Sequence, residues 1–386
     1  MIWAWWEGAA AAAPYYVLPF GALIFGSPRP NLKEYRPLPP ESQPLVSIII
    51  PARNEAGNIA RCLRSILAGD YQKIQVICVD DRSDDGTLEA AEAVAADDAR
   101  LTVVQGAMLP DGWYGKPWAC WQGTQFATAT ILLFTDADTV HGPHLLSRAV
   151  AALETERADL VTVMPRQEMA GFWERLVQPF FFLLLGLRFG SLKRLNRNRN
   201  PRHAIANGQF ILTWREAYEW VGGHRKVSGT VIEDLMLAVE YTKASRKLHF
   251  ALADEDMTTR MYDSLGAIVE GWSKNFFRGV MQTFEAKPLA YAAALLTLLF
   301  PAAFILPVVM LVRGLMIHSK AEVAFGGLAY GGATLLMATI LRASKAPMIY
   351  AIFHPLGALV TARILLRAIW RGTGLIEWKG RRYSHA

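Results

Sequence analysis

Charged residues are scarce in this chain. Only 19% of its 386 residues are Asp, Glu, Lys or Arg, against about 25% in an average globular domain. A disordered protein combines many charges with few apolar residues, so a hydrophobic content of 52% excludes that class. Cysteine is also rare. Cys62, Cys78 and Cys120 form no Cys-x-x-Cys pair, which argues against a disulfide framework and a zinc site and favours reduced, cytoplasmic thiols.

The scarcity of charge is uneven along the chain. Residues 1–30 predict a membrane anchor, because an uncharged stretch from residue 8 to 28 follows three tryptophans, as in an interfacial belt. The first charge is acidic, whereas a secretory signal begins with basic residues. Arg29, Lys33 and Arg36 come next. Since positive flanks stay in the cytoplasm, we expect the following domain to be cytoplasmic.

Residues 44–287 have the pattern of an α/β domain. Short apolar runs rich in β-branched residues alternate with helical patterns, which predicts a mostly parallel sheet with helices on both faces. The expected strands are 45–51, 75–79, 101–104 and 131–135, and the expected helices are 58–67, 87–95, 118–129 and 234–244. Such sheets bind ligands at the carboxyl ends of their strands, so the polar residues that follow each run are candidates for a site.

The C-terminal zone, 288–370, predicts further membrane segments. Residues 288–312 and 323–341 lack charge and are long enough to cross a bilayer. The segment 346–370 begins uncharged but carries two prolines and a histidine. Three crossings would place the basic tail, 371–386, on the side opposite to the α/β domain, against the positive-inside rule. We therefore expect a multi-pass protein with a cytoplasmic tail, in which 346–370 is re-entrant or interfacial.

One more apolar segment lies inside the middle domain. Residues 172–190 contain three consecutive phenylalanines followed by three leucines, and six basic residues lie between 188 and 202. A buried helix with a solvated basic loop would explain this pattern. Beside membrane segments, it also fits an interfacial helix that contacts anionic headgroups, which we expect. The basic residues gather beside apolar segments rather than among exposed aromatic residues, so we expect no nucleic-acid partner.

Acidic residues follow three of the four expected strands. They are Glu55 after the first run, Asp80 and Asp81 after the second, and Asp136 and Asp138 after the fourth. Acidic residues in such places often form turns or cap helices. Carboxylates along one rim repel one another, however, and need a cation or a donor-rich ligand. Two carboxylates separated by one residue suit Mg²⁺, which takes one or two protein carboxylates and completes its shell with water and phosphates.

The ordered set of motifs resembles a known family. Pro51–Glu55, Val79–Thr87, the Asp-x-Asp at 136–138 and Glu233-Asp234 occur in that order. Together they resemble the family 2 glycosyltransferases of the GT-A fold. The chain is similar to membrane-anchored bacterial lipid glycosyltransferases, in particular the hopanoid-associated, carotenoid (chlorobactene-type) and ceramide glucosyltransferases. The resemblance covers about residues 44–285, and it includes the tail sequence Trp378-Lys-Gly-Arg-Arg-Tyr383.

The resemblance implies roles for the motif residues. The base and ribose of a nucleotide-sugar, expected to be a UDP-sugar, would be held by Pro51, Arg53, Glu55 and Asp81, with Asp80 close by. Asp138 would bind Mg²⁺ or Mn²⁺, and Asp136 the metal or the sugar. Asp234 would be the general base that deprotonates the acceptor, with Glu233 the weaker candidate. Both could equally be first-turn residues that complement a helix dipole.

Four further residues come from weaker motifs. Lys116, in a Gly-Trp-x-Gly-Lys pattern, would place a positive charge beside the diphosphate, although it could also be a surface lysine. Gly208, between Asn207 and Gln209, would face the donor sugar or the acceptor. Many relatives carry Gln-x-x-Arg-Trp after the base, and this chain lacks that motif. In the corresponding helix, Trp272 would stack on the acceptor and Lys274 would replace the arginine at the diphosphate.

These expectations combine into one function. We expect an inverting enzyme that moves a single sugar from a nucleotide-sugar to a hydroxyl of a membrane lipid of isoprenoid, carotenoid, hopanoid or sphingolipid type. Two alternatives stay open. One is a polyprenyl-phosphate glycosyltransferase or a polysaccharide synthase, although two or three membrane helices are too few to enclose a polymer channel. The other is a non-catalytic membrane scaffold with a degenerate transferase domain.

Overall fold

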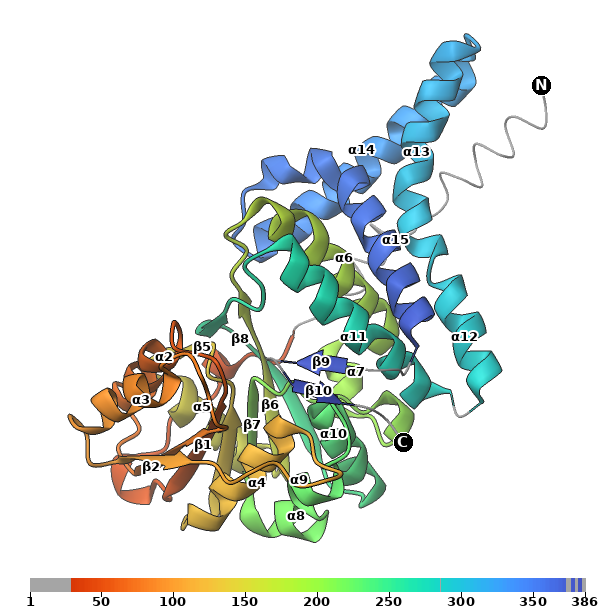
Figure 1. Cartoon of the computed structure of the whole chain (residues 1–386). Coiled ribbons are helices and arrows are strands. Elements are labelled where there is room, and N and C mark those ends of the chain that lie inside the picture. Colours follow the sequence, from red (N-terminus) through yellow and green to blue (C-terminus); the bar gives the residue numbers. More distant parts are fainter. Residues whose placement is uncertain (1–28, 285, 373–375, 379–380, 384–386) are drawn as a thin grey trace.

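The computed structural model describes residues 29–284, 286–372, 376–378 and 381–383. An α/β domain lies beside a layer of long helices, and two of these helices project away from it together (Figure 1). The predicted anchor falls almost wholly outside the described residues. At its end, Pro30 O accepts a hydrogen bond from Leu252 N of the sheet. The chain that follows the anchor is therefore held against the α/β domain.

Eight strands form one sheet in the order β3-β2-β1-β4-β7-β6-β8-β5. The strands are β1 Val46–Ala52, β2 Ile74–Asp80, β3 Leu101–Gln105, β4 Ile131–Thr135, β5 Thr139–His141, β6 Leu160–Gln167, β7 Phe210–Trp214 and β8 Leu248–Thr259. The block β3-β2-β1-β4 is parallel, as predicted, and so is the pair β6-β8. The strands β7 and β5 run antiparallel to their neighbours. The sheet is therefore mixed, with its parallel half at the amino-terminal end of the domain.

Helices cover both faces of this sheet. One face packs on α2 Ile59–Leu67, α3 Thr87–Ala95 and α5 Leu145–Thr155, and the other packs on α4 Gly115–Phe126, α8 Arg215–Trp220, α9 Gly223–Lys226 and α10 Glu233–Lys243. Successive side chains of a strand point to opposite faces. Accordingly Ile48 and Ile50 belong to the first apolar cluster and Ile49 to the second. Burial on both faces explains why the first strand is apolar throughout.

The helix α4 begins and ends three residues earlier than the sequence predicts. It spans Gly115–Phe126 rather than 118–129. Proline is tolerated in the first turn of a helix, so Pro117 does not delay the start. At the other end, the backbone N–H groups of Thr128 and Ala129 donate to Ser47 Oγ, which draws the chain out of the helix. Lys116 consequently lies in the first turn of α4 rather than in a loop before it.

Seven helical segments of the described residues form the layer beside the sheet domain. They are α6 Phe172–Phe189, α11 Leu265–Thr283, α12 Lys287–Leu296, α13 Leu299–Met316, α14 Lys320–Ala343, the short η4 Met348–Phe353 and α15 His354–Arg371. The remaining elements are η1 Leu32–Glu34, η2 Pro40–Ser42, α7 Leu192–Asn196, η3 Pro201–His203 and a C-terminal hairpin of β9 Ile376–Trp378 with β10 Arg381–Tyr383. The helices α13 and α14 form the projecting hairpin, and α15 packs along α6, α11 and α13 (Figure 1).

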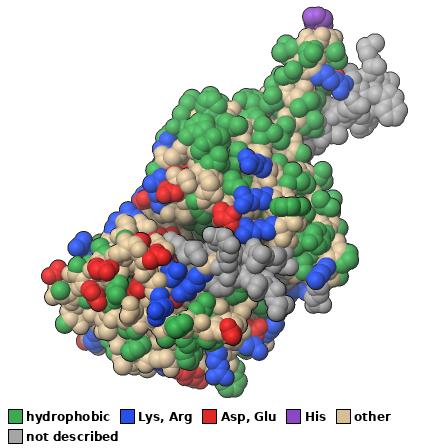
Figure 2. Space-filling model, in the orientation of Figure 1, with side chains coloured by type: hydrophobic (Ala, Val, Ile, Leu, Met, Phe, Trp, Pro, Cys, Tyr) green, Lys and Arg blue, Asp and Glu red, His purple; other side chains and the backbone are tan. Residues whose placement is uncertain are grey.

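Three stretches of this layer are long and apolar enough to cross a membrane. They are Lys287–Met316, Lys320–Ala343 and Met348–Arg371. The first two contain the predicted segments 288–312 and 323–341. Hydrophobic side chains cover the projecting hairpin, whereas acidic side chains gather at the opposite end of the molecule (Figure 2). The two ends of the molecule therefore differ in surface polarity, with an apolar surface at the hairpin and an acidic one at the far end of the α/β domain.

The helix α6 spans the predicted residues and joins the two parts. Its amino-terminal half is buried: Val177 and Phe181 pack in a cluster with α11 and α15, and Phe180 packs against Phe304 of α13. Further along, Leu187 is 51% exposed. The buried alternative therefore holds for the first half of α6, and the interfacial placement stays a prediction for its exposed end.

Candidate active site

The acidic strand ends meet at one edge of the sheet. The strands β2, β1 and β4 are neighbours, and Ala52 at the end of β1 pairs with Asp80 at the end of β2. Asp136 follows β4 directly. Because parallel strands end at the same edge, residues from three distant parts of the sequence come together there. This confirms the predicted rim of carboxylates.

The second strand end forms a buried acidic loop. Arg53 donates to the backbone carbonyls of Asp81 and Arg82, at 2.6 and 2.7 Å, while Asp80 Oδ2 accepts from Ser83 N. Asp80 and Asp81 are both buried, and in the described part of the chain their Oδ1 atoms have no hydrogen-bond partner. An unsatisfied buried acceptor costs about 1–3 kcal/mol. These two oxygens can therefore take N–H or O–H donors from a ligand.

Glu55 connects this loop to the first strand end. Its backbone N–H donates to the Thr87 hydroxyl, and its Oε2 accepts from Asn58 Nδ2 at 2.8 Å. Nearby, the Asp85 carboxylate accepts from Thr87 N and Ala56 N, and these contacts lower its pKa although burial opposes them. Asp85 thus bonds the start of α3, whose N-cap is Gly86, whereas the negative charge of Glu55 acts on Asp136 and helps to raise its pKa.

Lys116 is the centre of the charged cluster. Its Nζ lies 2.7 Å from Asp136 Oδ1 and 2.8 Å from Glu233 Oε1. Burial opposes the charge of the ammonium group, but Asp136, Glu233 and Asp234 together raise the pKa of Lys116 well above its ordinary value. Lys116 is therefore a positive group fixed among carboxylates rather than a solvated surface lysine.

Glu233 and Asp234 begin α10 and have different surroundings. Glu233 is buried, and burial raises its pKa to about 7 while Lys116 opposes the shift. Asp234 is half-buried, and its Oδ2 accepts from Gly208 N at 2.9 Å while its Oδ1 accepts from Leu235 N at 2.7 Å. The second contact is the first-turn role that the sequence left open. The more accessible Asp234 is the better candidate to meet an acceptor.

Gly208 is required by a close approach. A Cβ atom at this position would lie 2.8 Å from Lys116 Nζ and 3.0 Å from Asp234 Oδ2. Only glycine lets the backbone reach these two groups without moving them. The predicted Asn207-Gly208-Gln209 motif thus lies inside the cluster, before β7.

The helix α11 brings one of its two predicted residues toward the cluster. Burial lowers the pKa of Lys274 to about 8, and the carboxylates of Glu233 and Glu270 oppose that shift. Trp272 packs in the apolar layer, with its ring stacked on Phe181 at 4.2 Å between centroids. One face of the indole is therefore covered by α6, which is a structural contact that the sequence did not predict.

The Asp-x-Asp pair fits a divalent cation. Asp136 and Asp138 are both half-buried, and Asp136 is also held by Lys116. No group of three or more His, Cys, Asp or Glu residues able to hold a metal occurs in the part of the chain that the structure describes. Mg²⁺ does not need such a group, because substrate phosphates and water complete its shell. Asp138 is the principal candidate ligand.

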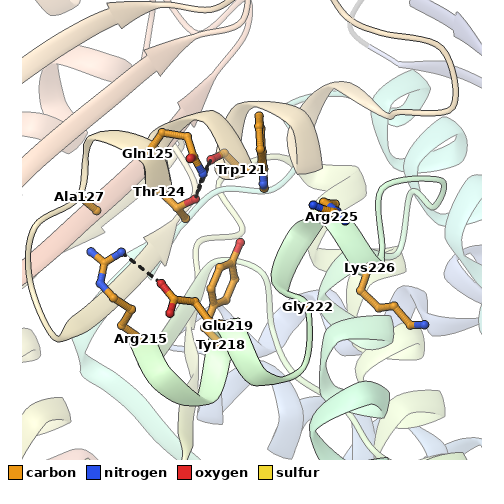
Figure 3. A pocket seen from close by; sticks show the side chains of 10 residues that line it. All are labelled: Trp121, Thr124, Gln125, Ala127, Arg215, Tyr218, Glu219, Gly222, Arg225 and Lys226. Atoms are coloured by element: carbon orange, nitrogen blue, oxygen red, sulfur yellow. Dashed lines mark hydrogen bonds and ion pairs between the residues drawn. The ribbon is translucent and has the colours of Figure 1, made fainter.

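Two cavities lie near α4, and only one belongs to this site. The smaller one lies beneath the cluster and is lined by Pro51, Lys116, Cys120, Phe134, Thr135, Asp136, Gly208, Ile211, His224 and Glu233. The larger one, an open depression of about 780 Å³ beside α8 and α9, is lined by Trp121, Arg215, Glu219, Arg225 and Lys226 among others (Figure 3). None of the predicted site residues lines it.

Two residues near the site have roles that the sequence did not settle. His224 is buried, bonds the Tyr218 hydroxyl at 2.9 Å, and has its pKa lowered to about 3 by burial, so it is a neutral core residue. Arg381 of β10 forms an ion pair with Asp81. The family resemblance includes the tail sequence Trp-Lys-Gly-Arg-Arg-Tyr, which was the available signal, but the sequence did not place this tail in the site.

Comparisons with known proteins agree with this geometry. A model of glycosyl transferase family 2 matches residues 47–222. The 4,4'-diaponeurosporenoate glycosyltransferase of Staphylococcus aureus is 30% identical over 349 residues, which cover 88% of each chain. The chain belongs to glycosyltransferase family 2. It is therefore an enzyme that transfers a sugar, as the resemblance implied.

A solved structure shows the same fold over almost the whole length. It is a mannosyltransferase from Pyrobaculum calidifontis in complex with GDP-Man and Mn²⁺, which is 19% identical, has a TM-score of 0.56, and matches 96% of this chain and 98% of its own. The match includes the helical layer as well as the sheet domain. The GT-A fold predicted from the sequence is thereby confirmed.

Proposed function

We propose that this glycosyltransferase moves one sugar from a nucleoside diphosphate sugar to a membrane lipid, with inversion at the anomeric carbon. The observation that carries the proposal is the cluster of Lys116, Asp136, Glu233 and Asp234 at the carboxyl edge of the sheet. It combines a fixed positive charge with an accessible carboxylate. Those are the two groups that a sugar transfer needs, one for the departing diphosphate and one for the acceptor proton.

The chain's own residues divide the work. Asp80, Asp81, Arg53 and Glu55 would hold the nucleoside, while Lys116 and Lys274 would stabilise the diphosphate as its charge grows. Asp234 would accept the proton of the incoming hydroxyl. A Mg²⁺ or Mn²⁺ ion bound by Asp138 would offset the charge of the diphosphate. The neighbouring complex with GDP-Man and Mn²⁺ supports such a donor and metal in general terms, and a UDP-sugar stays the first donor to test.

The acceptor follows from the helical layer and from the Staphylococcus aureus relative. That relative acts on diaponeurosporenoate by its name. In this chain the apolar helices α12 and α15 pack against α11, which carries Lys274. We infer an acceptor of long-chain isoprenoid or similar lipid type. A hydroxyl acceptor needs a base, whereas a carboxylate acceptor is already ionised. The choice between them therefore decides how much Asp234 contributes.

We also propose that both ends of the helical layer lie on the cytoplasmic side. Arg367 and Arg371, near the end of α15, form ion pairs with Glu270 of α11, and Arg381 reaches Asp81. These contacts support entry into the layer and exit from it on the same side, and hence an even number of crossings by the C-terminal segments. The helices α12–α13 and α14 supply that pair, with α15 at the interface and basic residues next to anionic headgroups.

The test is sugar transfer by membranes that contain the full chain. Membranes are supplied with Mn²⁺, labelled UDP- or GDP-sugars, and lipids bearing a hydroxyl or a carboxyl group, and the products are separated by thin-layer chromatography. Asp138→Asn and Asp234→Asn are compared with Asp97→Asn, an exposed residue between α3 and the start of β3. We expect one added sugar and a loss of about 100-fold or more in the first two variants with a hydroxyl acceptor. Full activity in both would refute the assignment.

The same assay separates the alternatives. A polysaccharide synthase would give a ladder of products, and a polyprenyl-phosphate transferase would demand that phosphate as its acceptor. A scaffold would bind a nucleotide-sugar but neither transfer nor hydrolyse it.

A further inference from the structure

The C-terminal hairpin ends at the nucleotide loop, 300 residues away in the sequence. Arg381 of β10 bonds Asp81 Oδ2 through one guanidinium nitrogen and Asp81 O through another, at 3.3 Å for the second contact. In the ion pair the arginine side chain is 17% exposed and the aspartate side chain 2%. The pair is therefore largely withdrawn from water, so removing one partner would leave the other charge buried and uncompensated.

The two oxygens of the Asp81 carboxylate have different environments. Oδ2 is bound by Arg381, whereas Oδ1 is buried with no hydrogen-bond partner among the residues described. The neighbouring Asp80 Oδ1 is in the same state. Carboxylate oxygens repel phosphate and accept from hydroxyl and N–H groups. The missing partner is therefore the nucleoside part of a ligand rather than its diphosphate.

The backbone of Asp81 is fixed from two sides. Its carbonyl accepts from Arg53, which follows β1, and from Arg381. Burial raises the pKa of the Asp81 carboxyl, and the two arginines act against that shift. Removing Arg381 would therefore free the side chain to rotate and leave a buried carboxylate without its nearest positive charge.

We propose that Arg381 is a positioning residue of the nucleotide site, which holds the Asp81 carboxylate so that its second oxygen meets the nucleoside. The proposal rests on the function proposed above, because it takes the strand-end rim as the donor site. It assigns the C-terminal hairpin, which follows the membrane-side helix α15, to the catalytic domain. An arginine is required, since its planar fork reaches the carboxylate and the carbonyl together.

The experiment measures nucleotide binding and transfer by the full chain in detergent. UDP and GDP are titrated separately in the presence of Mn²⁺ into the wild type, Arg381→Gln, Arg381→Lys and the control Arg64→Gln, an exposed arginine of α2. We expect Arg381→Gln to raise the Kd of the bound nucleotide by about 10- to 100-fold. The Kd of Arg381→Lys should lie between those of the wild type and Arg381→Gln, and the Kd of Arg64→Gln should equal that of the wild type. The donor KM should rise by the same factor while kcat at saturating donor changes less than about threefold.

The outcomes separate the possible failures. If the wild type binds neither UDP nor GDP, the proposed function is wrong. If the wild type binds but Arg381→Gln binds equally well, the positioning role is wrong, and tighter binding would show that Arg381 competes with the nucleotide. Melting temperatures are measured in parallel. If Arg381→Gln has a much lower melting temperature than the wild type, Arg381→Lys provides the test instead. Unchanged nucleotide affinity in Arg381→Lys would show that the forked guanidinium group of arginine is not needed. The double variant with Asp81→Asn should bind no worse than Asp81→Asn alone.

Discussion

At the scale of single residues, the site is organised by one lysine. Lys116 holds Asp136, which follows β4, and Glu233, which begins α10, in ion pairs shorter than 3 Å. Without the lysine these two carboxylates would repel each other. The ammonium group of Lys116 offsets the negative charge of these carboxylates in the free enzyme. The opposite charges of Lys116 and its carboxylate partners therefore offset one another before any substrate binds.

Replacing Gly208 with alanine should disturb this balance without unfolding the chain. The added methyl group would meet the flexible end of Lys116 and the Asp234 carboxylate, so the two side chains move while the backbone stays. We expect kcat to fall by about 100-fold, since displacements of 1 Å cost that much. The control is Gly57→Ala, where a Cβ meets nothing within 4 Å. Equal activities in a transfer assay would contradict the packing argument.

Lys274 should make donor binding depend on pH. Burial lowers its pKa to about 8, so the side chain is charged below that pH and neutral above it. If it binds the diphosphate, the donor KM should rise by about tenfold between pH 7 and pH 9. Arg remains charged over this range, so Lys274→Arg should flatten the profile. If the pH profile is the same in the variant, another group titrates, and Glu233 is the first candidate because burial raises its pKa to about 7.

At the scale of elements, the helix α15 is joined to α6 by a very close contact. A Cβ atom on Gly357 would collide with the Leu176 carbonyl and lie 2.9 Å from the Phe180 ring. Small residues let helices approach in this way. Two helices of the layer thus meet through backbone at Gly357, with little room to adjust.

Alanine at position 357 should therefore loosen the whole layer. The obstructing atom is backbone and cannot swing away, so we expect a loss of about 1–3 kcal/mol in the free energy of unfolding, as for an overpacked core. Thermal unfolding in detergent measures it. Gly331→Ala on α14, where a Cβ has open space, should unfold as the wild type does. A stable Gly357→Ala protein would show that α6 and α15 can separate.

The elements that sequence patterns predict well are those with strong local signals. The parallel block and α6 were found from apolar runs and from the aromatic cluster, and β4 spans its predicted residues 131–135. The strands β6 and β8 are not among the predicted strands. In β8 the apolar pattern is interrupted by three acidic residues, Asp254, Glu255 and Asp256. In the site, the motifs indicate the carboxylates, and the tail motif contains Arg381, but nothing in either motif indicates that Arg381 contacts Asp81. Tertiary proximity over 300 residues cannot be derived from spacing.

At the scale of the whole molecule, the same-side arrangement of both flanks can be tested by labelling. The native cysteines are buried, so single introduced cysteines report their own positions. Met316→Cys, near the tip of the hairpin, should react with a membrane-impermeant maleimide in intact spheroplasts, because the residue is 76% exposed and lies beyond the crossing. Lys33→Cys, on the α/β domain, should react only after lysis. Protection of both in intact cells would mean that the hairpin does not cross.

The link between Asp81 and Arg381 also has a consequence in time. During synthesis, 300 residues separate the two halves of that pair, and at a typical 5–20 residues per second this takes about 15–60 s. For that interval the sheet can fold and the apolar helices can enter the bilayer while the nucleotide loop still lacks its last contact. A nascent chain would thus reach its membrane before it gained full affinity for its donor, so that sugar is not consumed away from the lipid that receives it.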